Sequence, residues 1–292
     1  MREIEFTVTE SESGVTALEF LKSRGFSRRM ITALKASCGL TRSGELLRTV
    51  DNLRAGDVLR VRIEESGGLV PNTEICAAVV FEDADAVVFD KPPFLAVHPS
   101  VKHYSDTLGN LFAARYGEIP FRPINRLDRN TSGLCLCAKN KLAAAALAGT
   151  AQKVYFAVAD GCISESGRID APIDREEGSI IRRCVRADGK RAVTNYTPLL
   201  HAQGRTLLRI TLETGRTHQI RVHLAHIGFP LCGDELYGGD MSAIGRHALH
   251  CGGMTFLQPL TGERISVSAP LPEDMCALLG LDGAEKDERI YI

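Results

Sequence analysis

The sequence lacks any apolar run long enough to cross a membrane. Its N-terminus, MREIEFTVTE, also lacks the charged-then-apolar pattern of a secretory signal peptide. Both absences predict a cytoplasmic protein with no membrane partner. The nine cysteines are an odd number and include no CxxC pair, which argues against a disulfide framework and against a zinc site. Cys135 and Cys137 are therefore expected to be reduced and to pack as small hydrophobic side chains.

Internal repeats, low-complexity tracts and an excess of positive charge are absent as well. The formal net charge is −1, which by itself does not indicate nucleic-acid binding. The charge is unevenly distributed, however, because residues 20–48 contain seven basic side chains and the single acid Glu45. The seven are Lys22, Arg24, Arg28, Arg29, Lys35, Arg42 and Arg48. The sequence predicts a basic patch in this segment.

The chain has 292 residues, of which 44% are hydrophobic, so it is long enough for one large domain and a small one. Periodicity over residues 13–63 predicts a compact unit of two helices followed by short strands. The second helix has one apolar face, and its exposed side carries Arg28, Arg29 and Lys35. This unit is expected to be a small α/β domain.

A boundary follows at residues 64–71, EESGGLVP, where paired glycines and a proline are typical of a linker. We predict the small domain over residues 1–66, a linker over 67–72 and a large domain over 73–292.

The large domain is rich in short apolar and β-branched runs that predict strands. They are AAVVFED, AVVFD, GLCLCAK, KVYFAVADG, LLRITLE and RISVSAP. Helical patterns are fewer, and the clearest are Leu108–Tyr116, Lys141–Gly149 and His218–Ile227. This mixture predicts an α+β fold with a mainly antiparallel mixed sheet, rather than a wound parallel one.

Asp128 lies between Arg126 and Arg129, just before the turn-forming residues 130–133. The apolar run Leu134–Ala138 predicts a strand buried on both faces, so Asp128 should lie at the mouth of a strand. Two guanidinium groups beside a partly desolvated carboxylate stabilise its charge, which suits a structural ion pair or an anionic nucleophile. These residues alone do not decide between a turn or surface salt bridge and a catalytic group.

Four other segments carry groups that could act with this carboxylate. Residues 91–93, KPP, predict a rigid loop at the exit of a strand, and KVYFAVADG is an alternating strand with Lys153 and Tyr155 on one face. An arginine-rich hairpin spans 182–191, and TGRTHQIRVHLAHIGFPLCGDELYGG enters a helix after Arg216. Taken singly, the tyrosine suits a core or edge aromatic and the hairpin suits a solvated loop.

The three histidines His218, His223 and His226 invite a metal-binding interpretation. Their spacing does not support it, because His218 lies off the helix face that His223 and His226 share. No obvious carboxylate or cysteine completes a ligand set. We therefore predict no metal, and packing or RNA contact is the favoured interpretation of these histidines.

In this order, between residues 87 and 239, the segments together resemble the RluA-like, large-ribosomal-subunit type of pseudouridine synthase. NRLDRNTSGL is similar to the family signature around the catalytic aspartate, and KVYFAV to the strand with the active-site tyrosine. TGRTHQIRVHLAHIGFPLCGDELYG is similar to the arginine segment. The resemblance implies that Asp128 is the catalytic aspartate, that Tyr155 stacks on the target base and that Arg216 is the ion-pair partner of Asp128.

The resemblance also implies substrate contacts, and it departs from the family at one position. Ile220 would supply apolar contact in the pocket, and Arg126 and Lys153 are further substrate-binding candidates. Asn125 stands where the family usually has histidine. Packing beneath the site or RNA contact can therefore differ here, although the aspartate and the arginine beside it are retained.

Residues 13–63 resemble, more loosely, the S-four-type RNA-binding domain often placed ahead of this catalytic domain. That resemblance makes Arg28, Arg29 and Lys35 candidates for RNA contact. The expected partner is RNA, with ribosomal RNA favoured and transfer RNA as an alternative. A monomer is expected, because no apolar dimer stripe is evident.

Isomerising uridine to pseudouridine adds and removes nothing overall, so no cofactor is expected. A carboxylate can attack the anomeric carbon or carbon-6 of the ring, and both routes stay open, as does the base that removes the carbon-5 proton. Two other functions are weighed: a non-catalytic RNA-binding or ribosome-assembly protein with this fold, and a metal-assisted hydrolase. Intact Asp128, Tyr155 and Arg216 argue against the first.

Overall fold

The computed structural model describes residues 2–24, 26, 28–36, 38–63, 68–100 and 103–281. The chain divides into two compact units, Met1–Gly68 and Leu69–Ile292, and each is described by itself. The division falls after Gly68, within the segment expected to be a linker. Ser27, a residue type that favours the N-cap position and that directly precedes the second helix, lies outside the described residues.

The N-terminal unit packs two helices on a four-stranded antiparallel sheet with strand order β1-β4-β2-β3. Its elements are β1 (Arg2–Thr7), the 3-10 helix η1 (Glu10–Glu12), α1 (Ala17–Ser23), α2 (Arg28–Ala36), β2 (Leu40–Arg42), β3 (Glu45–Leu46) and β4 (Val58–Ile63). Helix α1 begins at a capping box, in which Thr16 Oγ1 accepts the Glu19 amide at 3.3 Å and the Glu19 carboxylate accepts the Thr16 amide at 2.9 Å. Leu59 and Val61 alternate into the core of this unit, as their spacing predicts.

The C-terminal unit is built on a ten-stranded sheet. Its strands are β5 (Ala78–Glu82), β6 (Ala86–Lys91), β7 (Arg122–Pro123), β8 (Ser132–Ala138), β9 (Gln152–Asp160), β10 (Gly167–Asp170), β13 (Val193–Ala202), β14 (Arg205–Leu212), β15 (Leu249–Leu257) and β16 (Arg264–Ser268). A separate hairpin pairs β11 (Ile173–Arg175) with β12 (Arg183–Val185). The helices are α3 (Leu108–Tyr116), α4 (Lys141–Leu147), α5 (Gln219–His226), the 3-10 helix η2 (Glu235–Tyr237) and α6 (Glu273–Ala277).

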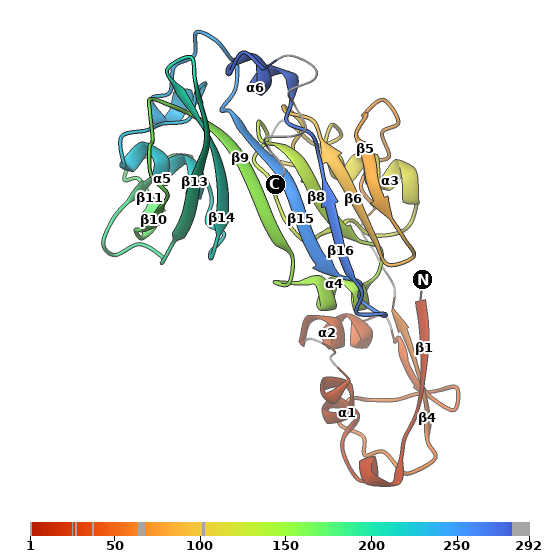
Figure 1. Cartoon of the computed structure of the whole chain (residues 1–292). Coiled ribbons are helices and arrows are strands. Elements are labelled where there is room, and N and C mark those ends of the chain that lie inside the picture. The colour runs from red at the N-terminus through yellow and green to blue at the C-terminus, as the bar shows by residue number, and fades with distance from the viewer. Residues whose placement is uncertain are drawn as a thin grey trace. The chain divides into compact units, whose positions relative to one another are not determined.

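The main path through the large sheet runs β10-β13-β14-β9-β15-β8-β6-β5, with β16 paired to β15 and β7 paired to β8. Figure 1 shows these strands side by side, from β13 and β14 through β9, β15 and β8 to β6 and β5. All of the named pairings are antiparallel except that of β15 with β8, which is parallel. The predicted α+β class with a mainly antiparallel mixed sheet is confirmed.

Strand β15 lies at the centre of the sheet, between β9 and β8, and the sequence patterns do not predict it. Gly252 and Gly253 interrupt its apolar pattern, and glycine weakens a strand signal. Close approach requires another glycine beside it: Gly133 on β8 has φ +107, and a Cβ there would overlap the backbone of Cys251. Tyr155 on β9 pairs with Cys251 from the other side. The strand therefore joins the two segments that carry the candidate site.

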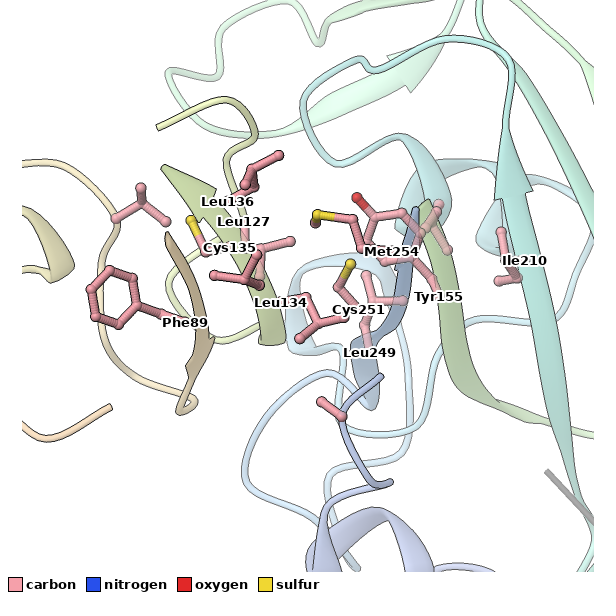
Figure 2. Packing of buried hydrophobic residues seen from close by; sticks show 14 of the residues in the cluster. Phe89, Leu127, Leu134, Cys135, Leu136, Tyr155, Ile210, Leu249, Cys251 and Met254 are labelled. Atoms are coloured by element: carbon pink, nitrogen blue, oxygen red, sulfur yellow. The ribbon is translucent and has the colours of Figure 1, made fainter. Parts of the chain in front are cut away.

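The hydrophobic core runs continuously through the middle of this sheet. All seven residues of β8 are buried, as expected for a strand covered on both faces, and Cys135 and Cys137 are fully buried among apolar neighbours. Figure 2 shows the continuity, with Phe89 on β6 followed by side chains from β8, β15 and β9 and finally Ile210 on β14. This rigid centre fixes the strand ends beside Asp128.

Within the residues that the structure describes, no helix is long and apolar enough to cross a membrane. The described part of the chain also holds no group of three His, Cys, Asp or Glu side chains placed to bind a metal ion. The cytoplasmic location and the monomeric state remain predictions.

Replacing Gly133 with alanine should destabilise the C-terminal unit by about 3 kcal/mol, because the new Cβ combines a left-handed backbone with overlap of the Cys251 backbone. Gly149→Ala is the matched control: φ is also positive, at +77°, but nothing lies within 4 Å of an added Cβ. It should cost about 1 kcal/mol. Thermal and urea unfolding followed by circular dichroism measure both losses, and equal losses would contradict the close-approach argument.

Candidate active site

Asp128 lies on the turn between β7 and β8, and 31% of its side chain is exposed. The turn closes where the Thr131 amide donates to the Asp128 carbonyl at 3.1 Å. The carboxylate opens into a pocket of about 70 Å³. Its lining residues come from the turn, β9, β14, the start of α5 and β15: Arg126, Leu127, Asp128, Thr131, Tyr155, Leu212, Arg216, His218, Gln219, Ile220, Arg221 and Leu249.

The turn is held from beneath by Lys91, whose side chain is fully buried at the end of β6. Its Nζ donates to the carbonyl oxygens of Pro92 at 2.9 Å, Leu95 at 2.8 Å and Arg129 at 3.2 Å. Burial lowers the pKa of Lys91 to about 7, while the three carbonyl acceptors match the three N–H groups of its charged form. Lys91 therefore ties the loop after β6 to the residue that follows Asp128.

A second support comes from the residues just before β15. Arg246, 2% exposed, pairs through Nε and Nη2 with Asp274 at 2.7 and 2.8 Å, and its Nη1 donates to the Asn130 carbonyl at 3.3 Å. His247 Nε2 lies 2.8 Å from Thr131 Oγ1. Burial, together with nearby cations, lowers the pKa of His247 to about 2, so the ring is neutral. The residues after Asp128 are thus held by several independent contacts.

Arg221, in the first turns of α5, is the guanidinium that faces Asp128, with Nη1 3.4 Å from Oδ2. The rest of its fork is bound by Asp234, through Nε to Oδ2 and Nη2 to Oδ1, both at 2.7 Å. The Asp234 side chain is fully buried. Burial alone would lower the pKa of Arg221, but the Asp234 carboxylate more than offsets this and raises it. Asp234 therefore fixes the guanidinium and leaves Nη1 for Asp128.

The expectation that Arg216 is the ion-pair partner of Asp128 is corrected by this geometry. Arg216 lines the pocket, but its side chain is exposed and its Nε donates to the Arg191 carbonyl at 3.0 Å. It precedes α5, and its amide donates to the side chain of Gln219 at 3.0 Å, which turns this stretch toward β13. Among the described residues, no guanidinium other than that of Arg221 lies within 4.0 Å of the Asp128 carboxylate.

Of the other site residues expected from the sequence, Tyr155, Ile220 and Arg126 line the pocket and Lys153 does not. Tyr155 is 7% exposed and Ile220 is 4% exposed, and both line the pocket. Burial raises the pKa of Tyr155 well above its ordinary value, so it is a neutral phenol. Arg126 lies at the rim with an exposed side chain. Lys153 is not among the lining residues, and its Nζ donates to the Ala151 carbonyl at 3.1 Å.

His218 belongs to the pocket, a placement that the sequence argument about metal ligands misses. Its Nε2 lies 3.7 Å from Asp128 Oδ2, and its Nδ1 lies 2.9 Å from the Tyr237 hydroxyl. His218 and Arg221 are three residues apart, the spacing that places two side chains on one side of a helix start. His223, in contrast, has both ring nitrogens engaged within the unit, by Thr194 and by the Ala171 carbonyl.

Asn125, which departs from the family pattern, supports the site from outside the pocket. Its Oδ1 accepts the Leu136 amide at 2.9 Å, and its Nδ2 donates to the Leu134 carbonyl at 3.1 Å. The amide thereby pairs with β8 much as another strand residue would. Asn125 therefore holds the start of β8 and is not among the residues that line the pocket.

Comparisons with known proteins show the family of this chain. A family model described as RNA pseudouridylate synthase matches residues 85–226. A protein of Bacillus subtilis (strain 168), described as the uncharacterized RNA pseudouridine synthase YjbO, is 38% identical over 280 residues, which cover 91% of this chain and 98% of that protein. The chain belongs to the RNA pseudouridine synthase family. It is therefore an isomerase that converts uridine to pseudouridine in RNA.

Two further relatives of this pseudouridine synthase extend the comparison. The ribosomal large subunit pseudouridine synthase D of Xanthomonas campestris is 36% identical, over 87% of this chain and 84% of that protein. The solved structure of human RNA pseudouridylate synthase domain containing 1 covers 74% of this chain and 94% of its own, with a TM-score of 0.60 and 24% identity. That structure supports the fold.

Arg221→Lys should reduce the synthase turnover about 100-fold, because lysine keeps the charge but cannot hold Asp234 with two N–H groups while offering a third to Asp128. Arg216→Lys is the matched control and should stay within a few-fold of wild type. Single-turnover pseudouridine formation, with melting temperature as a check on folding, measures both. A larger loss for the Arg216 variant would restore the pairing expected from the sequence.

Proposed function

We propose that this synthase modifies uridine in large-subunit ribosomal RNA and that Asp128 is its nucleophile. The observation that carries the catalytic assignment is the carboxylate at the pocket, with Oδ2 facing Arg221 and the buried Tyr155 forming a wall beside it. The ribosomal assignment is supported by relatives named ribosomal large subunit pseudouridine synthase D, from Xanthomonas campestris and Pseudomonas aeruginosa.

The reaction breaks the bond from the anomeric carbon to ring nitrogen-1 and forms a bond from that carbon to ring carbon-5. Carbon-5 loses a proton and nitrogen-1 gains one, so atoms and electrons balance without an oxidant or a cofactor. The Asp128 carboxylate attacks either the anomeric carbon or carbon-6, and both routes need one free carboxylate oxygen. Arg221 aims the group, while Tyr155 and Ile220 hold the uracil by stacking and apolar contact.

The target nucleotide must leave its base stack to reach Asp128. The pocket has a volume of about 70 Å³ and opens to solvent at its mouth. Arg126 and Arg216 are exposed at that mouth and carry positive charge. They suit contact with the phosphates on either side of a flipped nucleotide.

We further propose that the N-terminal unit is an S-four-type RNA-binding domain whose contact surface is α2. Three of the seven basic side chains in residues 20–48 pair with acids: Arg24 with Glu12, Arg42 with Asp57 and Arg48 with Asp51. Arg28 and Lys35 are exposed on α2, and no carboxylate among the described residues pairs with either. These two cations are therefore available to phosphate; the Arg29 side chain lies outside the described residues.

The arginine-rich segment 182–191, which contains β12, is a weaker candidate for RNA contact than its composition suggests. Of its arginines, Arg182 pairs with Glu176, Arg186 with Asp188 and Arg191 with Glu213. Phosphate would have to compete with these carboxylates, and exposed pairs of this kind are weak enough to exchange.

Asp128→Asn should reduce turnover by about 10³-fold or more while RNA affinity stays within a few-fold, because the change removes the nucleophile and keeps the shape. The measurement is tritium release from RNA labelled at uridine carbon-5, with filter binding alongside. Ribosomal and transfer RNA transcripts are compared, so that the same assay sorts the substrate class. Residual turnover with lost binding would refute the nucleophile assignment.

Arg28→Gln combined with Lys35→Gln should reduce the slope of log affinity against log salt by about 1.4, as expected for two lost phosphate contacts on a single strand. The rate of the chemical step at saturating RNA should not change. Arg42→Gln with Arg48→Gln removes the same charge from residues that already have acidic partners and is the matched control. An equal fall in slope for both pairs would remove α2 from the RNA-binding account.

A further inference from the structure

The two groups that face the Asp128 carboxylate approach the same oxygen. Arg221 Nη1 lies 3.4 Å and His218 Nε2 lies 3.7 Å from Oδ2. Among the described residues, none donates a hydrogen bond to Oδ1, whereas Oδ2 accepts one from Arg221. The two carboxylate oxygens are therefore not equivalent, and the difference is set by α5 and the turn before it.

The hydrogen bonds around Tyr237 determine which nitrogen of His218 carries the proton. A backbone amide can only donate, so the Tyr237 oxygen accepts from the Arg183 amide at 3.0 Å. Burial raises the pKa of Tyr237, which keeps its hydroxyl proton available for His218 Nδ1 at 2.9 Å. Since Nδ1 then accepts, the proton of the neutral ring lies on Nε2, the nitrogen that faces Asp128.

The His218 ring is neutral because it is buried, and a neutral ring suits its position beside Asp128. Burial lowers the pKa of His218, against the raising effect of the Asp128 carboxylate, while Arg221 lowers it further. A second full cation on Oδ2 would bind the carboxylate strongly and reduce its power to attack carbon. A neutral N–H orients the same oxygen with a smaller electrostatic cost.

The backbone of His218 is also constrained. Its φ is +58°, a left-handed conformation that non-glycine side chains adopt at a cost, and it lies at the N-cap of α5. The side chain of Gln219 holds this turn by accepting from Thr214 Oγ1 at 2.9 Å and donating to the Val193 carbonyl at 2.9 Å. The surrounding contacts thus maintain the conformation that delivers the ring to Asp128.

We propose that His218, oriented by Tyr237, is a positioning residue that holds Oδ2 of Asp128 together with Arg221 and leaves Oδ1 as the attacking oxygen. This inference rests on the proposed role of Asp128 as nucleophile. The two separations of 3.4 and 3.7 Å are expected to shorten in the reaction complex, where catalytic hydrogen bonds tighten.

Two substitutions separate the Nε2–H group from the rest of the side chain. In His218→Asn the amide reaches only as far as Nδ1, and asparagine tolerates the left-handed backbone. In His218→Gln the amide nitrogen reaches the position of Nε2. We expect kcat to fall about 30-fold for the asparagine variant, with KM for RNA within about threefold, and to recover to within about fivefold of wild type for the glutamine variant.

Tyr237→Phe provides an independent check, because it removes the hydroxyl that sets the ring tautomer and leaves His218 in place. It should lower kcat by less than the asparagine change and leave KM unaltered. Melting temperatures are measured for all three variants, so that turnover is compared among folded proteins.

Wild-type kcat in His218→Asn, or equal losses in the asparagine and glutamine variants, would overturn the positioning role. Absence of tritium release from any RNA by the wild type would instead contradict the proposed substrate. Release by both the wild type and Asp128→Asn would contradict the nucleophile assignment. Each failure is therefore distinguishable from the others.

Discussion

A single guanidinium shared between two carboxylates is the interaction on which the site depends. Asp234, fully buried, binds two N–H edges of Arg221, and the remaining Nη1 faces Asp128. Removing Asp234 and removing Asp128 would have different effects. Loss of Asp234 would leave a buried cation without its main partner, which typically costs about 3–5 kcal/mol. Asp128 is partly solvated, and loss of this proposed nucleophile would chiefly affect turnover.

The strand order of the large sheet brings the side chains of the site together. Strand β15 runs parallel to β8 only at Ser132 and Gly133, and this short contact places Arg246 and His247 beneath the turn that carries Asp128. Because β9 pairs with the other side of β15, Tyr155 reaches the same pocket from a strand far away in sequence. Precision at Asp128 therefore comes from the rigid sheet centre, although the residue itself lies on a turn.

The sequence predicts this arrangement unevenly, for identifiable reasons. A continuous apolar run predicts β8, and the helical spacing of apolar residues predicts α3 and α5. These elements can be predicted because their signals lie within a short stretch of sequence. The sequence patterns do not predict strand β15, because Gly252 and Gly253 interrupt its apolar run. Only the folded sheet shows that Gly252 leaves room for the ring of Phe156 on β9. Asp128 pairs with Arg221 rather than Arg216 because of where α5 begins and because the side chain of Gln219 binds the residues before it. Both features depend on contacts formed only in the folded protein, so local sequence does not reveal them. The basic patch is likewise reduced by acids distant in sequence, such as Asp57 beside Arg42.

A nucleophilic carboxylate must satisfy two opposing requirements: it has to be aimed, and it has to keep its negative charge available. Full neutralisation by a dedicated cation would satisfy the first requirement at the expense of the second. The structure divides the task, because the charge of Arg221 is bound mainly by Asp234, and the second donor, His218, is neutral. Both lie nearest to one oxygen, Oδ2, so in the proposed reaction orientation is gained on Oδ2 while Oδ1 keeps its electron density for carbon. The buried ion pair thus contributes geometry more than stability, in keeping with the small net stability that buried ion pairs generally provide.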